Sequence, residues 1–312
     1  MLTTAAKGVY IISATPFHDD GRIDTASTDR LIDFYKSSGV SGITVLGMMG
    51  EAPKLDAGEA QSFVKQVVTR ARELPVIVGV SAPGFAAMRT LAQSSMQAGA
   101  AGVMIAPPGS VKTDDQIVNY YADTVNAIGP DVPFVVQDYP LSTGVVMSNS
   151  VIERIVAAHP SCVMLKHEDW PGLEKISAMR KAQAEGRMRH ISILTGNGGL
   201  FLDFEMSRGA DGAMTGYAFP EMLVGVCRLM AQEKRDAAHD LFDAHLPLVR
   251  YEQQPGAGLA VRKYALMRRG IIASDAQRKP GGSLSATSRR EVDYLLARLA
   301  RHEPAAAKLL AD

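Results

Sequence analysis

The chain has 312 residues, of which 46% are hydrophobic, and its 33 basic residues balance 33 acidic ones. This composition is typical of a folded protein with a large core. The charge balance argues against a nucleic-acid partner, because nucleic-acid binders normally carry a basic excess or a basic stripe. The N-terminus lacks the regions of a secretory signal, and no apolar run approaches a membrane span. We therefore expect a cytoplasmic protein without a membrane partner.

Few residues suggest a disulfide or a metal site. The two cysteines, Cys162 and Cys227, each lie inside an apolar stretch and are predicted to be small buried side chains. His239 and His245 lie on one predicted helix, but their spacing does not put both on one face. We therefore expect no metal site.

Short apolar runs alternate with segments of helical periodicity along most of the chain. Near-continuous apolar strands between amphipathic helices indicate a parallel sheet that is buried on both faces. Eight such units predict a closed (β/α)8 barrel, the TIM barrel, because open sheets of this kind more often have about five to seven strands. The predicted strands are Val9–Ala14, Ile43–Leu46, Val76–Val80, Gly102–Ala106, Pro133–Gln137, Cys162–Lys166, Ile191–Leu194 and Gly212–Thr215. The predicted helices are Thr28–Ser38, Ala57–Glu73, Arg89–Ala98, Thr113–Ile128, Ser150–Ala158, Leu173–Glu185 and Leu200–Arg208.

The small-residue turns between a helix and the next strand share a pattern of two glycines. We expect the first glycine to end the helix and the second, such as Gly102 or Gly212, to permit close packing of helix on strand. The remaining residues, 219–312, are predicted to be mostly helical, with a loop at Ser274–Leu284. No polar linker precedes them, so we expect a barrel at 1–218 and a helical extension at 219–312 that packs on it as one unit. The predicted helices of the extension are Glu221–Lys234, Ala237–Glu252, Gly258–Arg269 and Ser288–His302.

Catalytic groups in such barrels lie at the carboxyl ends of the strands. Lys166 is the lysine that ends an apolar strand, Cys162–Lys166. Partial desolvation at the barrel mouth favours its neutral form, and a neutral amine attacks a ketone to give an iminium that serves as an electron sink. The alternative is a salt-bridged lysine beside His167, Glu168 and Asp169. His167 is predicted to pack away from the site, because adjacent residues of a strand point in opposite directions.

A second candidate is the loop Gly47-Met48-Met49-Gly50-Glu51, which follows the second predicted strand. Glycines at such a turn let backbone N–H groups approach an anion closely. Two glycines alone are weak evidence, but the loop faces the same barrel mouth as Lys166. We therefore predict that Gly47, Met48, Met49 and Gly50 contribute to substrate binding.

These features together resemble the dihydrodipicolinate synthase/N-acetylneuraminate lyase family over almost the whole chain. The resemblance implies that Lys166 forms a Schiff base with a 2-keto acid, and that the Gly47–Glu51 loop binds the keto-acid carboxylate. It also implies that the covalent imine takes the place of a separate cofactor, and that the protein is a homotetramer, a dimer of dimers. The matching pieces are Gly8…Ala14-Thr15-Pro16-Phe17, Gly47-x-x-Gly50-Glu51, Pro140…Thr143-Gly144, Lys166 and Gly209-Ala210-Asp211-Gly212.

Departures from the family pattern bear on the substrate. The family tyrosine that shuttles protons is replaced by Gln137, and Tyr139, two residues later, either takes over this role or only packs. Met48 and Met49 replace the loop's usual pair of hydroxyl residues. The arginine with which dihydrodipicolinate synthases bind their dicarboxylate substrate aligns near Ser142 and is absent, so that activity is not expected.

The chain also resembles another branch of the family, the 2-keto-3-deoxy sugar-acid dehydratases of the L-2-keto-3-deoxyarabonate type. The similar pieces are Val136-Gln137-Asp138, Gly212-Ala213-Met214-Thr215-Gly216 with Phe219-Pro220, and Leu246-Pro247-Leu248 with Glu252. The glutamate that this branch has two residues after the Schiff-base lysine corresponds to Glu168, which either removes the C3 proton or orients Lys166 or His167. Asn197 either binds substrate hydroxyls or is a turn residue. Thr215 and Gly216 are predicted to line the same mouth.

Three functions remain open at this stage. The first is a dehydratase acting on a 2-keto-3-deoxy sugar acid, which the loss of the tyrosine favours. The second is an aldolase of the same family that releases pyruvate from a similar substrate. The third is a non-catalytic keto-acid sensor that retains the fold, against which the retained lysine and the lack of a basic surface run both argue.

Overall fold

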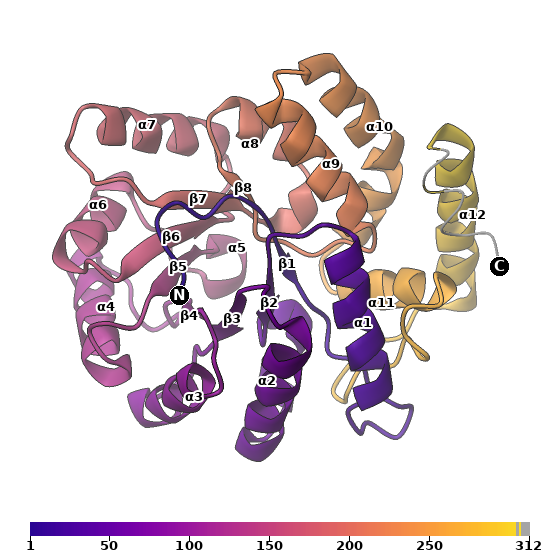
Figure 1. The fold of residues 1–312 in the computed structure, drawn as a ribbon, viewed down its shortest axis with the longest axis horizontal. Helices are drawn as coiled ribbons and strands as arrows, with labels where there is room; N and C mark the ends of the chain where they lie inside the picture. The colour runs from indigo at the N-terminus through magenta and orange to yellow at the C-terminus, as the bar shows by residue number, and fades with distance from the viewer. Residues whose placement is uncertain (304–305, 307–312) are drawn as a thin grey trace.

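A computed structural model describes residues 1–303 and 306, and it confirms the predicted barrel. Eight parallel strands form a closed barrel in which each strand pairs with the next and β8 pairs with β1 (Figure 1). Most strands begin or end within a residue or two of the predicted limits. The strands are β1 Gly8–Ile12, β2 Gly42–Val45, β3 Val76–Gly79, β4 Gly102–Ile105, β5 Phe134–Asp138, β6 Cys162–His167, β7 Ser192–Thr195 and β8 Gly212–Ala213.

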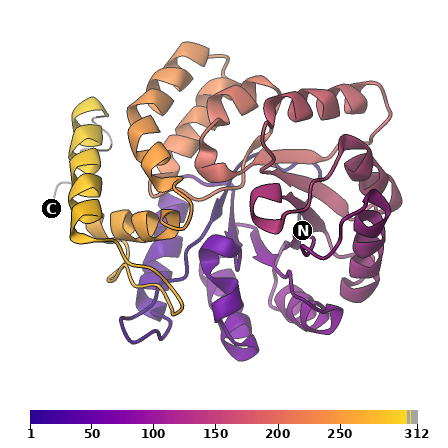
Figure 2. The same ribbon diagram turned by 180° about the vertical axis from the view of Figure 1, so that it is seen from behind.

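Helices surround this barrel, as the views from both sides show (Figures 1 and 2). Reciprocal capping fixes the start of two of them, because the side chains of Asp56 and Thr113 accept from the backbone of the residue three positions on, whose side chain accepts in return. The surrounding helices are α1 Thr25–Ser37, α2 Ala57–Ala71, α3 Phe85–Gln97, α4 Asp114–Ile128, α6 Asn149–Ala158, α7 Leu173–Ala184, α8 Leu202–Ser207 and α9 Pro220–Ala231. A short helix, α5 Pro140–Thr143, forms the turn after β5.

Glycines let neighbouring strands approach each other where the barrel closes. A Cβ on Gly212 would overlap the backbone of Gly8, and both residues have positive φ. Likewise, a Cβ on Gly102 would lie 2.7 Å from the carbonyl oxygen of Pro133, the residue before β5. The prediction that these glycines permit close packing of helix on strand is therefore wrong, because the close neighbours belong to adjacent strands.

Apolar side chains fill the barrel interior and the layer between strands and helices. Tyr10, Ile77, Met104 and Met164 belong to the inner cluster. Leu2 joins that cluster and donates its backbone N–H to the Ala101 carbonyl at 2.8 Å, so the N-terminal segment closes the amino end of the barrel. The carboxyl end is the one at which polar groups gather.

Both cysteines are fully or almost fully buried, as predicted, and burial raises the pKa of each thiol to about 12. Cys162 and Cys227 therefore act as small hydrophobic side chains.

The first helix of the predicted extension is α9, which lies in the ring and contacts β1 and β8. The rest of the extension contains α10 Arg235–Glu252, α11 Gly258–Arg268 and α12 Ala286–His302. It packs on the side of the barrel formed by α1 and α9 (Figures 1 and 2). The predicted loop at Ser274–Leu284 lies against the first βα loop, where Arg278 donates to the carbonyl of Gly21 at 2.7 Å. The predicted extension also includes residues 304–305 and 307–312, which lie outside the described part of the chain.

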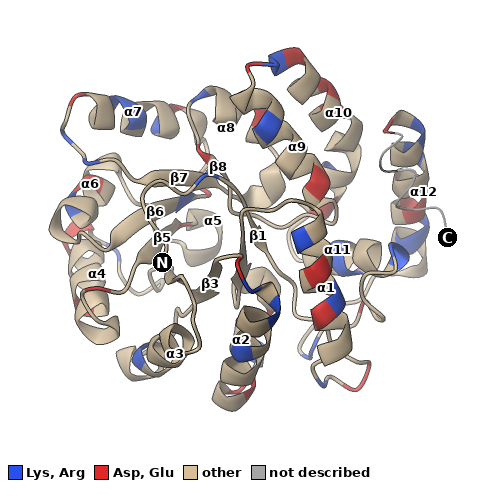
Figure 3. Ribbon diagram, viewed as in Figure 1, with Lys and Arg blue, Asp and Glu red and all other residues tan. Residues whose placement is uncertain are grey.

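Charged residues of both signs are spread over the outer helices, and the strands carry few (Figure 3). Among the described residues, no helix combines the length and the apolar character that crossing a membrane requires.

Candidate functional site

Lys166 and Glu168 form a buried ion pair at the carboxyl end of β6. The Lys166 Nζ lies 2.7 Å from the Glu168 Oε1, and each side chain is 7% exposed. The Gln137 amide on β5 donates to the same carboxylate oxygen at 2.8 Å. The structure thus brings together three of the predicted site residues on two neighbouring strands.

The strand register explains this arrangement. Lys166 pairs with Gln137 of β5 and with Leu194 of β7, and side chains at one level of a parallel ladder share one face. β6 extends one residue beyond the predicted limit, to His167. The His167 ring points away from Lys166, toward the Gly172 carbonyl oxygen at 3.1 Å, as alternation along the strand predicts.

The loop after β7 closes around Glu168. A Cβ on Gly196 would overlap the Glu168 side chain, so this position has room only for glycine. Asn197 has a positive φ of 50°, and its side-chain amide donates to the Glu168 carbonyl at 3.0 Å. Of the two interpretations of Asn197, the turn residue is the one for which the structure supplies a contact. Its side chain fixes the backbone of Glu168.

Tyr139 lies just beyond β5, at the start of α5, and is half-buried. Burial raises the pKa of its phenol, and the negative charge of Glu168 raises it further. The phenol therefore stays protonated at neutral pH and is available as a hydrogen-bond donor near Glu168. The neighbouring Asp138 is engaged elsewhere, because the Lys175 Nζ contacts it at 2.5 Å.

The Gly47–Glu51 loop follows β2 at the same end of the barrel. Its residues Met48–Gly50 form a single 3-10 turn, and the two methionines point in different directions. Met49 packs against the inner apolar cluster, whereas Met48 is 43% exposed and its sulfur lies 3.0 Å from the Ser142 hydroxyl. The loop is therefore in contact with the turn after β5.

Thr215 and Gly216 follow β8 at the mouth, but contacts within the protein occupy their carbonyl groups. The Thr215 carbonyl accepts from the Ile12 N–H at 2.8 Å, and the Gly216 carbonyl accepts from Arg262 at 2.5 Å. A Cβ on Gly216 would overlap the Arg262 guanidinium, which accounts for the glycine. Arg262 also pairs with the buried Glu252. The C-terminal extension therefore borders the mouth.

A model of the dihydrodipicolinate synthetase family matches residues 5–299. The chain belongs to this family. Because the match spans residues 5–299, the family resemblance is confirmed over nearly all of the chain. Members of this family are lyases that act through a Schiff base on small keto acids.

Individual relatives carry two different activities in their names. The L-2-keto-3-deoxyarabonate dehydratase of Azospirillum brasilense is 28% identical over 302 residues, which are 95% of this chain and 96% of that protein. A 4-hydroxy-tetrahydrodipicolinate synthase of Sorangium cellulosum is 32% identical over 214 residues, which are 67% of this chain and 68% of that protein. A crystal structure of a dihydrodipicolinate synthase from Rhodopseudomonas palustris superposes with a TM-score of 0.94 at 63% identity, covering 95% of this chain and 99% of that one.

A further buried carboxyl group, Glu205, lies near the Lys166–Glu168 pair and was not among the predicted site residues. Glu205 on α8 is buried, and burial raises its pKa to about 8, with smaller contributions from Asp203 and Glu168. It lies in the lining of a cavity of about 560 Å³ that also includes Trp170 and Phe201. Glu205 belongs to the predicted helix Leu200–Arg208 and precedes Met206 and Ser207, so nothing in the local pattern distinguishes it from a surface glutamate.

Proposed function

We propose that this family member is a dehydratase that removes water from a 2-keto-3-deoxy sugar acid, of the L-2-keto-3-deoxyarabonate class. The observation that carries the proposal is the Glu168 carboxylate, which lies 2.7 Å from the Lys166 Nζ and is held by Gln137. A carboxylate beside the nitrogen that becomes the iminium is close to the substrate carbons next to the carbonyl. A proton-transfer group needs this proximity.

In the proposed reaction, Glu168 first accepts a proton from the Lys166 ammonium. The neutral amine then attacks the C2 carbonyl, and the carbinolamine hydroxyl leaves as water with the proton held by Glu168, which gives the iminium and returns Glu168 to its carboxylate form. Glu168 next removes a proton from C3, and the electron pair of that C–H bond moves into the enamine. The enamine electrons then form the C3–C4 double bond as the C4 hydroxyl leaves with a proton as water. Hydrolysis by one water returns Lys166, so the substrate loses one water overall.

Other residues have supporting roles in this proposal. The backbone N–H groups of the Gly47–Glu51 loop bind the substrate carboxylate. The protonated Tyr139 phenol donates the proton with which the C4 hydroxyl leaves, and the proton taken from C3 then passes from Glu168 to Tyr139. Asn197, Thr215 and Gly216 form the wall around the sugar carbons. No cofactor is required, because the imine is the electron sink.

The competing activities differ from this one at particular positions. An aldolase would need a base at the C4 hydroxyl proton, and the family tyrosine position holds Gln137, which is not a base. A dihydrodipicolinate synthase would need a cation for its dicarboxylate substrate, and Ser142 stands where the sequence comparison expects that arginine. The R. palustris protein is named a dihydrodipicolinate synthase, and this activity and the aldolase activity are the two alternatives to the proposed dehydratase.

The test is incubation of the purified protein with 2-keto-3-deoxypentonates and 2-keto-3-deoxyhexonates, followed by mass spectrometry of the products. We expect a product one water lighter than one of these substrates, and no pyruvate. Release of stoichiometric pyruvate would establish the aldolase instead. A protein that turns over neither substrate and forms no imine would be the non-catalytic sensor.

We also propose that the protein is a cytoplasmic homotetramer, in line with the family resemblance. Light scattering coupled to size-exclusion chromatography measures its mass in solution directly, and a monomer or dimer would contradict this part of the proposal.

A further inference from the structure

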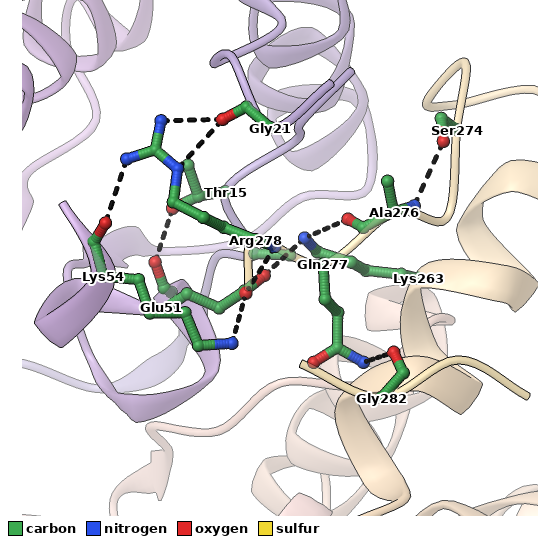
Figure 4. Close-up of polar contacts among 12 residues, drawn as sticks. Thr15, Gly21, Glu51, Lys54, Lys263, Ser274, Ala276, Gln277, Arg278 and Gly282 are labelled. Atoms are coloured by element: carbon green, nitrogen blue, oxygen red, sulfur yellow. Dashed lines mark hydrogen bonds and ion pairs between the residues drawn. The ribbon is translucent and has the colours of Figure 1, made fainter. Parts of the chain in front are cut away.

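Glu51, the last residue of the Gly47–Glu51 loop, has a buried side chain that is held by three donors (Figure 4). The Lys263 Nζ contacts its Oε1 at 2.5 Å, and the Lys54 Nζ contacts its Oε2 at 2.8 Å. The backbone N–H of Arg278 also donates to Oε2, at 3.1 Å. Two of these donors lie in the C-terminal extension, more than two hundred residues along the chain.

Lys263 is as fixed as the carboxylate that it contacts. It is fully buried in α11, donates also to the Ala276 carbonyl at 2.8 Å, and lies 4.6 Å from the centroid of the Phe17 ring. Burial lowers the pKa of Lys263, and the charge of Glu51 opposes this shift. A lysine in this position has no access to substrate, so its contact with the loop is its contribution.

The loop itself needs such support, because its backbone is strained at both ends. Leu46 and Glu51 have positive φ angles of 55° and 57°, a left-handed conformation that side chains other than glycine rarely adopt. Such residues persist where surrounding contacts hold them. At one end this contact is the Glu51 carboxylate. Inside the loop, the Thr15 hydroxyl donates to the Gly50 carbonyl at 2.6 Å.

Arg278 connects the C-terminal extension to the residues that follow the loop. Its guanidinium donates to the Lys54 carbonyl at 2.9 Å and forms two bonds with Glu59, whose side chain accepts from the backbone of Asp56, the N-cap residue of α2. Arg278 therefore holds the segment between the loop and α2, while Lys263 holds Glu51 at the end of the loop (Figure 4).

We propose that Lys263 and Glu51 are positioning residues, which hold the backbone N–H groups of the loop in the orientation that binds the substrate carboxylate. This inference rests on the proposed function, in which the loop is the carboxylate site. It makes the C-terminal extension part of the binding site. Preorganised donors bind an anion without the cost of ordering the loop at each binding event.

The experiment compares imine formation with two ketones by borohydride trapping and intact-mass measurement. Pyruvate carries the carboxylate, whereas hydroxyacetone has a hydroxymethyl group in its place. For Lys263→Met, we expect the half-saturating pyruvate concentration to rise on the order of tenfold, with the same trapped fraction at saturation. The second-order rate constant for hydroxyacetone should stay within twofold of the wild type, because that ketone does not use the loop.

The matched control is Arg180→Met, which removes an ion pair with Asp211 at the opposite, amino end of the barrel. This variant should lose stability but bind pyruvate as the wild type does. If Lys263→Met does not fold, Lys54→Met serves instead, because its side chain is 20% exposed and it removes one donor to Glu51. For Lys54→Met we expect a smaller rise in the same direction.

Two outcomes would overturn the inference while leaving the proposed function intact. One is an unchanged half-saturating concentration of pyruvate in the folded variant. The other is an equal loss with pyruvate and hydroxyacetone, which would mean that the substitution disturbs the whole mouth. A wild-type protein that traps no pyruvate at all would instead contradict the proposed function itself.

Discussion

The molecule contains two buried lysine–glutamate pairs at the same end of the barrel, and they differ in what else contacts them. Lys166 and Glu168 lie 2.7 Å apart, and Lys263 and Glu51 lie 2.5 Å apart. Among the described residues, the Lys166 Nζ has Glu168 as its one polar partner. The Lys263 Nζ has a second partner in the Ala276 carbonyl and lies over the Phe17 ring, whereas the two glutamates are alike in accepting from three donors each. The pairs therefore differ at the lysine: Lys166 has N–H groups left for a substrate, whereas Lys263 is engaged by Glu51, Ala276 and the Phe17 ring.

This difference distinguishes the proposed catalytic lysine, Lys166, from the structural lysine, Lys263, more clearly than burial does. Burial alone does not tell the two lysines apart, because Lys166 is 5% exposed and Lys263 is fully buried. Only a lysine that can give up its carboxylate partner and meet a carbonyl carbon can act as a nucleophile. Lys263 is enclosed by α11, Phe17 and the 274–284 loop, so exchanging its contacts would require the extension to open.

The largest expected effect comes from removing the first lysine. Lys166→Ala should abolish the adduct trapped by borohydride with pyruvate, because the attacking amine is gone. Lys166→Arg should abolish it as well, since a guanidinium is not a nucleophile at neutral pH. Lys263→Met, at saturating pyruvate, should still form one adduct per chain. An adduct that persists in Lys166→Ala would assign the imine to another lysine.

The next effect in size concerns the partner of Lys166. Glu168→Gln keeps a side chain of the same shape that can still bond with Lys166, but it removes the base. We expect turnover to fall by about 10²- to 10⁴-fold, while imine trapping with pyruvate persists. If Glu168 only orients Lys166, Glu168→Gln will keep most of its turnover, and a steady-state assay beside the trapping assay tells the two roles apart.

The second pair should matter more for stability. Lys263→Met leaves Glu51 buried with one donor fewer, which is expected to cost about 3 kcal/mol in the free energy of unfolding. The double variant Lys263→Met, Glu51→Gln should recover part of this loss, because a buried neutral amide needs the missing cation less than a buried carboxylate does. Urea denaturation measures all of these variants. If the double variant is no more stable than Lys263→Met, the Glu51 charge is not the cause of the lost stability.

The two pairs also differ in how well the sequence alone predicts them. Lys166 follows a run of apolar residues that defines a strand, and the family pattern implies its chemistry, so the sequence alone predicts both its place and its role. The contact between Lys263 and Glu51 spans 212 residues. No local pattern brings them together, because the extension must first dock on the barrel. For the same reason Glu51 was read only as part of a glycine turn.

The roles of several glycines were missed for a related reason. Gly196 and Gly216 make room for Glu168 and Arg262, side chains that come from other elements of the fold. Periodicity locates the strands, but it does not show which side chains meet at their ends. The contact of the Asn197 side chain with the Glu168 carbonyl likewise depends on how the β6 and β7 loops meet, which no local pattern shows.

A third buried carboxyl group, Glu205, sharpens the comparison, because no ion pair with it occurs among the described residues. Burial raises its pKa from 4.5 to about 8, so the folded protein holds a proton that the unfolded chain releases. Folding stability from this group is therefore full below about pH 4.5 and is lost as the pH rises toward 8. Glu205→Gln removes the dependence, because the amide stays neutral.

The stability of Glu205→Gln relative to the wild type should accordingly rise by about 2 kcal/mol between about pH 6 and about pH 8. Thermal unfolding at a series of pH values measures this as a widening gap between the two melting temperatures. A constant gap would mean that a cation or water reaches Glu205 and keeps it ionised in the fold. Glu205 would then resemble the other two carboxylates, and a partner rather than burial would set the behaviour of all three.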